Sequence, residues 1–112
     1  DAILGAMSED DIGVHFPDTD AGIEGIDSAL ILARVAELTA KRGYRVINVD
    51  SVVVAQRPKI APYRDAMKEK IARILSVDPA MVGIKGKTTE GLGVTGRGEG
   101  IAAHAVVLIE RL

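Results

Sequence analysis

Cysteine and tryptophan are absent from the sequence, and other aromatic residues are scarce. The absence of cysteine excludes disulfide bonds and thiol chemistry, and it suits a reducing compartment. With one phenylalanine and two tyrosines, a hydrophobic core must be built from valine, isoleucine, leucine and alanine. Hydrophobic residues make up 47% of the chain. We therefore expect a single domain over residues 1–112, because either half alone would bury too little apolar surface.

Long apolar runs and an excess of positive charge are also missing. No run approaches the roughly 20 apolar residues that are needed to cross a bilayer. The net charge of -2 argues against a nucleic-acid surface, because binding to a phosphate backbone needs a clear excess of lysine and arginine. We expect a soluble, cytoplasmic protein that binds neither a membrane nor a nucleic acid.

The first quarter of the chain divides into a helical part and a polar part. Ile3, Leu4 and Met7 share one face at helical spacing, so residues 1–10 resemble the last turns of a helix. From 11 to 27 the chain is polar and interrupted by glycine and proline, which predicts a long loop. Long ordered loops in small domains are often functional.

The remaining sequence alternates between helical and extended patterns. Asp27 and Ser28 provide an N-cap for a helix that ends near Arg42. The pattern then predicts a strand at 44–56 and a helix between turns at 57–59 and 78–79. A short strand at 82–85, a glycine-rich loop at 86–100 and a last strand at 101–110 follow. We expect a small α+β domain, a ferredoxin-like two-layer sandwich of helices on a mixed sheet.

The last predicted strand, 101–110, is apolar on both faces apart from His104. In so small a domain, a strand that is buried on both sides indicates that one face meets another subunit. His104 is then expected to be a packed or interface residue, because no partner stands at metal-ligand spacing from it. His15, the other histidine, also lacks such a partner.

The segment from Lys85 to Gly100 is the sharpest local feature of the sequence. Its glycines allow backbone N–H groups to approach phosphate oxygens, and its lysines, arginine and threonines add further donors. Glu90 has the opposite charge, which is useful only if a cation accompanies the phosphates. Composition alone slightly favours a plain glycine-rich turn. Neither a P-loop nor a dinucleotide fingerprint fits, because Met81 stands where the P-loop needs glycine and the G-x-G-x-G run precedes a strand.

Two other clusters are candidates for ligand contacts. The carboxylates between Asp10 and Asp20 are dense enough to bind a metal or sugar hydroxyls, although most such runs are solvated loops. The residues from Ala55 to Ala61 follow a predicted strand, at the kind of position where ligand loops gather, with an ordinary strand-to-helix turn as the alternative. No G-x-S-x-G elbow is present, so a serine hydrolase is not expected.

Three segments together resemble one known family: DIGVHFPDTD at 11–20, AQRPK at 55–59 and TTEGLGVTGRGEG at 88–100. In their order and approximate spacing they resemble the 2-C-methyl-D-erythritol 2,4-cyclodiphosphate synthase family. The third segment is highly specific, and the resemblance covers all 112 residues.

The resemblance implies a metal-dependent lyase of the non-mevalonate pathway of isoprene biosynthesis. Such an enzyme cyclises 4-diphosphocytidyl-2-C-methyl-D-erythritol 2-phosphate and releases CMP, because the substrate's own phosphate oxygen attacks the β-phosphorus of its diphosphate. It also implies a homotrimer with active sites between neighbouring subunits. The reaction needs folding of the substrate, charge neutralisation and alignment more than covalent help from the protein.

The resemblance also implies roles for single residues. Thr88 would steady the transferring phosphoryl group, and Glu90 would bind a Mg or Mn ion on the diphosphate. The rest of the phosphate pocket would be formed by Lys87, Thr89, Val94 and Arg97. The acidic segment would hold the methylerythritol portion, through Asp11, Ile12, Gly13, Phe16, Pro17, Asp18, Thr19 and Asp20. The cytosine would lie against Ala55, Gln56, Arg57, Pro58, Lys59, Ile60 and Ala61.

Some positions depart from the family pattern. Many members have threonine where this chain has Lys87, which could add a direct charge to the phosphates, and an aromatic residue where it has Val94, near the central cavity of the trimer. The family's zinc ligands, an Asp-x-His pair and a further histidine, would precede Asp1. We therefore expect the domain to lack its N-terminal part and to hold zinc only through ligands outside this chain.

Two alternatives stay open from the sequence. A non-catalytic trimeric nucleotide sensor would use the same glycine loop and basic residues without metal or turnover. The chain is otherwise compatible with the C-terminal part of a two-enzyme fusion. An Asp-x-His pair and a histidine encoded upstream of Asp1 would support the enzyme against the sensor.

Overall fold

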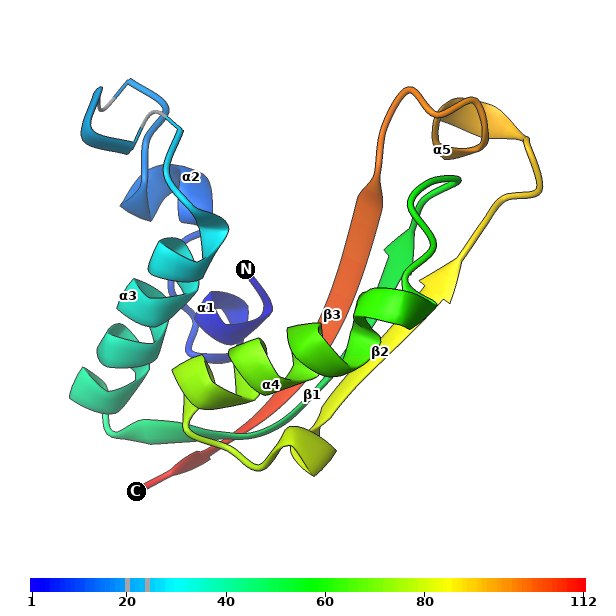
Figure 1. The fold of residues 1–112 in the computed structure, drawn as a ribbon. Helices are drawn as coiled ribbons and strands as arrows, with labels where there is room; N and C mark the ends of the chain where they lie inside the picture. Colours follow the sequence, from blue (N-terminus) through cyan, green and yellow to red (C-terminus); the bar gives the residue numbers. More distant parts are fainter. Residues whose placement is uncertain (20, 24) are drawn as a thin grey trace.

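The sheet at the centre of the molecule is mixed and has three strands. The computed structural model describes residues 1–19, 21–23 and 25–112 (Figure 1). The strand order is β2-β1-β3, in which β1 (Tyr44–Val54) pairs in parallel with β2 (Val82–Lys87) and antiparallel with β3 (Ala102–Arg111). A parallel pair needs a crossover, and the helix between β1 and β2 provides it. The predicted α+β class with a mixed sheet is confirmed.

Three helices cover one face of this sheet: α1 (Ala2–Ala6), α3 (Ser28–Lys41) and α4 (Arg64–Leu75) (Figure 1). The Asp27 carboxylate accepts a hydrogen bond from the Ala29 N–H at 2.9 Å, so the predicted N-cap of α3 is confirmed.

Short turns complete the helical layer. The 3-10 turn η2 (Ala61–Tyr63), which contains Pro62, leads into α4, and η3 (Pro79–Met81) leads into β2.

Among the helices of the described residues, none is long and apolar enough to span a membrane.

The core lies between the helices and the sheet. The buried hydrophobic side chains of the described residues are all aliphatic, as the scarcity of aromatic residues predicts. All of them except Ala55 belong to two clusters. The first consists of Ile3, Leu4, Val35, Val46 and Leu75, and the second of Ala72, Val82 and Ile84.

The strand β3 is apolar on both faces, and only one face is covered within the chain. Val107 and Ile109 pack against the first core cluster. On the opposite face Val106 is 75% exposed and Leu108 is 57% exposed. His104 lies opposite Val52 in the register and is exposed in this single chain.

A charged pair lies on the same open face of the sheet. Asp50, which pairs with Val106 in the register, accepts hydrogen bonds from Lys85 Nζ at 2.7 and 2.6 Å. The hydrogen bond from Lys85 holds the pKa of Asp50 below its usual value. Both side chains are half-exposed, so this pair adds little to the stability of the fold.

The predicted loop at 11–27 is wrong in part, because it contains a short helix and a 3-10 turn. These are α2 (Ile12–His15) and η1 (Ala21–Ile23). The first N–H of α2, on Ile12, donates to the Asp1 carboxylate at 2.8 Å. A cap that stands 11 positions away is invisible to a local pattern, which explains the error.

The glycine-rich segment also has more structure than predicted. β2 continues to Lys87, two residues past its predicted end, and the turn α5 (Gly93–Gly96) lies within the predicted loop. β3 begins and ends one residue later than predicted.

Two arms extend from the core in Figure 1. The acidic arm consists of α2 and the residues around it, 11–19, above the start of α3. The glycine arm consists of 55–61 and 86–101, beyond the ends of β1, β2 and β3. The radius of gyration is 14.9 Å, against about 13 Å for a compact chain of 100 residues, and this agrees with two projecting arms.

Candidate active site

Strand pairing brings two of the predicted segments together at the base of the glycine arm. Val54 pairs with Lys87 in the parallel register, and the next N–H, on Ala55, donates to the Lys87 carbonyl at 3.0 Å. Gly86 lies so close to Ile60 that a Cβ at position 86 would stand 2.9 Å from the Ile60 Cβ. The segment after β1 and the segment at the end of β2 therefore form one wall.

A cavity of ≈ 530 Å³ opens along this wall. Most of its lining was predicted from the sequence to contact substrate. The lining residues are Ala55, Gln56, Pro58, Lys59, Ile60, Ala61, Arg64, Gly86, Lys87, Thr88 and Glu90. The cavity has the size of a small-molecule site and combines backbone, cationic and hydroxyl groups.

Arg64 belongs to this cavity and was missed by the sequence analysis. Its Nε donates to the Ile84 carbonyl at 3.1 Å, which holds the guanidinium near the mouth of the site. The available signal was its position, in the first turn of the helix that directly follows 55–61. With Lys59 and Lys87 it makes the lining cationic, and among the described residues Glu90 is the only carboxylate that lines this cavity.

A second hollow, of ≈ 610 Å³, adjoins the first on the same arm. Gln56 lines both, and the Arg57–Pro58 peptide bond between them is cis. The far side of this hollow is the stretch 96–101. Arg97 is held there by Glu99, because its Nε donates to Glu99 Oε1 at 2.7 Å. The predicted contact residue Arg97 thus faces the same region as 55–61.

The two predicted catalytic residues, Thr88 and Glu90, both line the first cavity. The Thr88 hydroxyl accepts a hydrogen bond from the Glu90 N–H at 3.3 Å. Glu90 has a φ of 54°, a left-handed conformation that is unusual for a residue with a side chain. A hydroxyl donor, a carboxylate and several cations at one cavity suit a diphosphate that carries a divalent ion.

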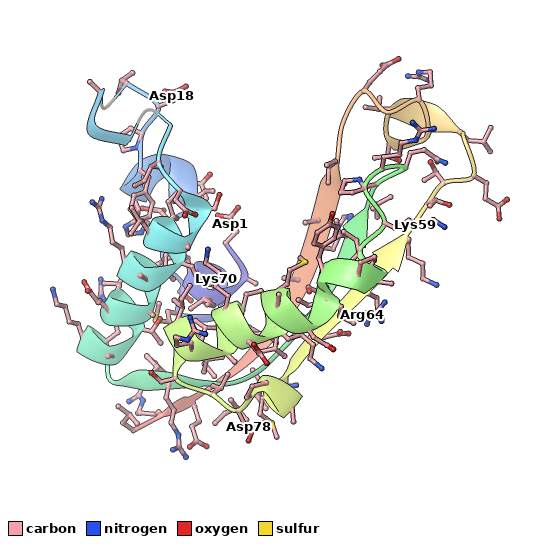
Figure 2. All side chains as sticks on the ribbon, viewed as in Figure 1. Asp1, Asp18, Lys59, Arg64, Lys70 and Asp78 are labelled. Carbon is pink, nitrogen blue, oxygen red and sulfur yellow. The ribbon has the colours of Figure 1, made fainter. Side chains whose placement is uncertain are left out.

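The acidic arm holds the other predicted segment at a different place. Figure 2 shows Asp18 at the tip of this arm, while Lys59 lies on the other arm. Phe16 is turned toward α3, with the Arg34 guanidinium 5.9 Å from its ring centroid. Asp11, Ile12, Gly13, Pro17, Asp18 and Thr19 are exposed, and the predicted contact Asp20 lies outside the described residues.

Glu9 fixes the base of the acidic arm and was also missed by the sequence analysis. Its carboxylate forms an ion pair with Arg42 after α3 and lies 3.5 Å from His15 Nε2 in α2. The Glu9 side chain is only 15% exposed. No local sequence pattern predicts this role, because Glu9, His15 and Arg42 come together only in the folded chain.

The single chain does not bring its two arms together into one site. Neither hollow of the glycine arm is lined by a residue of 11–19. Among residues 1–19, 21–23 and 25–112, no group of three or more histidine, cysteine, aspartate or glutamate side chains could hold a metal ion.

Comparison with known proteins identifies the family. The pattern that defines the YgbB family matches residues 1–110. The 2-C-methyl-D-erythritol 2,4-cyclodiphosphate synthase of Geotalea uraniireducens is 54% identical over 111 residues, which cover 99% of this chain and 71% of that protein. The chain belongs to this synthase family. The synthase of Caldicellulosiruptor bescii is 55% identical over 97% of the chain and 69% of its own length.

Solved structures of synthase relatives have the same fold. The IspF of Plasmodium falciparum in a CDP complex matches with a TM-score of 0.85 and 37% identity, over 99% of this chain and 66% of that one. The bifunctional IspDF of Campylobacter jejuni matches with a TM-score of 0.95 and 38% identity, over 100% of this chain and 30% of that one. The chain thus spans about seven-tenths of its curated relatives and two thirds or less of these two solved ones.

Membership in the synthase family confirms the resemblance and the enzyme function that the sequence predicted. Synthases of this family are isoprenoid-pathway enzymes and use a divalent metal. The alternative of a non-catalytic nucleotide sensor is not favoured by these relatives.

Proposed function

We propose that this chain cyclises 4-diphosphocytidyl-2-C-methyl-D-erythritol 2-phosphate and releases CMP, with the diphosphate bound in the cavity of the glycine arm. The observation that carries the proposal is the meeting of 55–61 with Thr88 and Glu90 around one cationic cavity. The relative from Plasmodium falciparum is described as a CDP complex, which supports a cytidine diphosphate ligand.

The reaction is an intramolecular displacement at phosphorus. A phosphate oxygen of the substrate bonds to the β-phosphorus, and the bond from that phosphorus to the bridging oxygen breaks, so that CMP leaves with the α-phosphate. Backbone groups of 55–61 hold the cytosine, which fixes one end of the substrate. Lys59, Arg64 and Lys87 neutralise the diphosphate, and the Thr88 hydroxyl donates to the phosphoryl oxygen where charge shifts.

The metal part of the proposal divides between two ions. A Mg or Mn ion suits Glu90, because a hard cation prefers carboxylate oxygen together with phosphate oxygens. Such an ion supplies charge neutralisation on the diphosphate. Zinc usually needs three or four protein ligands, and the described residues offer no such group. A zinc ion would therefore need ligands other than the described residues of a single chain.

We further propose a homotrimer in which the active site lies between two subunits. The open face of β3, with Val106 and Leu108, supports burial against another copy, because exposed aliphatic side chains of this size favour association. The acidic arm and the glycine arm of one chain do not share a hollow, so an acidic arm from a neighbour would complete each site. A cytoplasmic location agrees with a biosynthetic enzyme without cysteine.

A mixing experiment in the full-length protein tests the function and the shared site together. Asp11→Asn damages the acidic arm and Thr88→Val damages the glycine arm, and each variant alone should release little CMP from the substrate. Equal co-expression should restore about a quarter of the wild-type activity, because each site draws one arm from each of two randomly chosen subunits.

The control is a mixture of two acidic-arm variants, Asp11→Asn and Asp18→Asn, which should restore nothing. A wild-type protein that binds CDP but releases no CMP would contradict the proposed reaction. Restoration in neither mixture, with an active wild type, would contradict the shared site alone.

A further inference from the structure

Thr89 and Thr95 form a chain of two hydroxyls in the turn at the tip of the glycine arm. Thr89 Oγ1 donates a short hydrogen bond to the Leu92 carbonyl, and it also lies 3.1 Å from Thr95 Oγ1. A hydroxyl has a single proton. The Thr89 proton is used in the bond to the Leu92 carbonyl, so toward Thr95 the Thr89 oxygen can only accept. The Thr95 hydroxyl must therefore donate to Thr89.

The direction of this chain separates two adjacent threonines. Thr88 accepts from the Glu90 N–H and keeps its own proton, for which the described residues provide no acceptor. Thr89 has already donated its proton within the loop. Of the two hydroxyls, only that of Thr88 is free to donate to a phosphoryl oxygen.

The backbone around the hydroxyl chain is closely packed. The Leu92 N–H donates to the Thr89 carbonyl at 3.0 Å, so Thr89 and Leu92 are joined in both directions. A Cβ at Gly96 would stand 2.3 Å from the carbonyl carbon of Gly91 and 2.8 Å from Thr89 Oγ1. The turn α5 is thus pressed directly onto 89–91.

This packing matters because the loop receives little other support. It extends beyond the strand ends in Figure 1. Within the part of the chain that the structure describes, the hydrogen bonds of residues 88–99 all join residues of this loop. Glu90 and Gly91 both have positive φ, at 54° and 81°. A bond that fixes Thr89 also fixes the unusual backbone of its neighbour Glu90.

We propose that Thr89 is a positioning residue and not a substrate contact: with Thr95 as its donor, it holds the turn on which Thr88 and Glu90 are carried. The inference rests on the proposed function of those two residues. It adds Thr95 and Gly96, which were not among the predicted contacts, to the residues that shape the site.

The test compares Thr89→Val, which removes the hydroxyl at nearly constant shape, with Thr89→Ser, which keeps it, in the full-length protein. Thr89→Val should lower kcat for CMP release by about tenfold, the equivalent of one hydrogen bond, and Thr89→Ser should stay close to wild type. Thr95→Val should also lower kcat. The double variant with valine at both positions should be no worse than Thr89→Val alone, because Thr95 acts only through the Thr89 hydroxyl.

A second measurement does not depend on activity. Amide hydrogen exchange at Leu92 and Gly96 should become about tenfold faster in Thr89→Val and in Thr95→Val, with the Ala55 amide unchanged. Additive losses in the double variant, or normal exchange at Leu92 and Gly96, would overturn the proposal. If the wild type released no CMP, the proposed function would fail, and the exchange rates would still decide whether the hydroxyl chain holds the loop.

Discussion

The two arms of the molecule are fixed by different means. The base of the glycine arm grows out of regular strand pairing, in which the register of β1 with β2 sets 55–61 beside 86–90. The acidic arm has no strand beneath it and is attached by single side chains, Asp1 to the start of α2 and Glu9 to His15 and Arg42. In the proposed function, an arm fixed by strand pairing would bind the diphosphate, and a more lightly held arm would bind the rest of the substrate.

This difference between the arms matches the different positional demands of the two ends of the proposed substrate. A phosphoryl transfer needs its donors fixed within fractions of an ångström, which strand ends can provide. In the proposed trimer, an acidic arm supplied by a neighbouring subunit would bring the methylerythritol end, which carries the attacking phosphate, into line with the β-phosphorus.

The largest loss of activity is expected if assembly is prevented while both arms of each chain remain intact. Val106→Asp places a carboxylate on the open face of β3, where burial of an unpaired charge costs several kcal/mol. We expect a monomer by light scattering at micromolar concentration and nearly complete loss of CMP release. Met81→Lys, on an exposed residue of η3, is the matched control and should stay trimeric and active. A fully active monomer would show that one chain contains the whole site.

A large effect is also expected within the rigid arm. Thr88→Val removes one preorganised donor to the phosphoryl group, which costs about 3 kcal/mol, on the order of a hundredfold in kcat. CMP binding should change little, because in the proposed site the cytosine is held by 55–61 and not by Thr88. Turnover measured across a manganese titration should stay low at every concentration. Recovery at high manganese would assign Thr88 to the metal.

Glu90→Gln should have a smaller effect and a different metal response. The change keeps the shape of the side chain but weakens its hold on a cation, so activity should fall by about tenfold at low metal. Raising magnesium or manganese should restore part of it, since mass action refills a weakened site. A loss that no metal concentration relieves would place Glu90 against the substrate itself.

The smallest effect is expected in the lightly held arm. Glu9→Gln weakens the links to His15 and Arg42, and pairs of this kind contribute at most about 1 kcal/mol. The KM for the substrate should rise by up to about fivefold, with kcat and CDP affinity nearly unchanged. Glu37→Gln, which removes an exposed carboxylate of α3, is the matched control. A fall in CDP affinity in Glu9→Gln would contradict the separation of the arms.

The sequence predicts most of the fold where the signals are local. The capping residue Asp27 and the Val- and Ile-rich stretch 44–56 each carry their own pattern, and both elements stand close to their predicted bounds. α2 was missed because the side chain that caps it belongs to Asp1, 11 positions before Ile12 in the sequence. Propensity alone could not reveal a partner so far away.

The candidate site was predicted through family resemblance and not through chemistry alone. Composition slightly favoured a plain turn at 86–100, and the charge rule favoured a solvated loop at 11–20. Neither rule could show that Lys59 and Glu90 share a cavity, since that depends on the parallel pairing of β1 with β2. Nor can the sequence separate the two adjacent threonines, because the difference lies in folded contacts: Thr89 donates its proton to the Leu92 carbonyl, whereas Thr88 accepts from the Glu90 N–H.

The hydrogen bond from Ile12 to Asp1 closes the first twelve residues into a ring. Because Asp1 and Ile12 are joined, the chain between them, which contains α1, has to span a fixed distance. Substitutions on its exposed side can vary freely, but an inserted or deleted residue between Met7 and Asp10 would pull Ile12 off its acceptor. In this short stretch the number of residues is therefore constrained in addition to the identities of Ile3, Leu4 and Glu9.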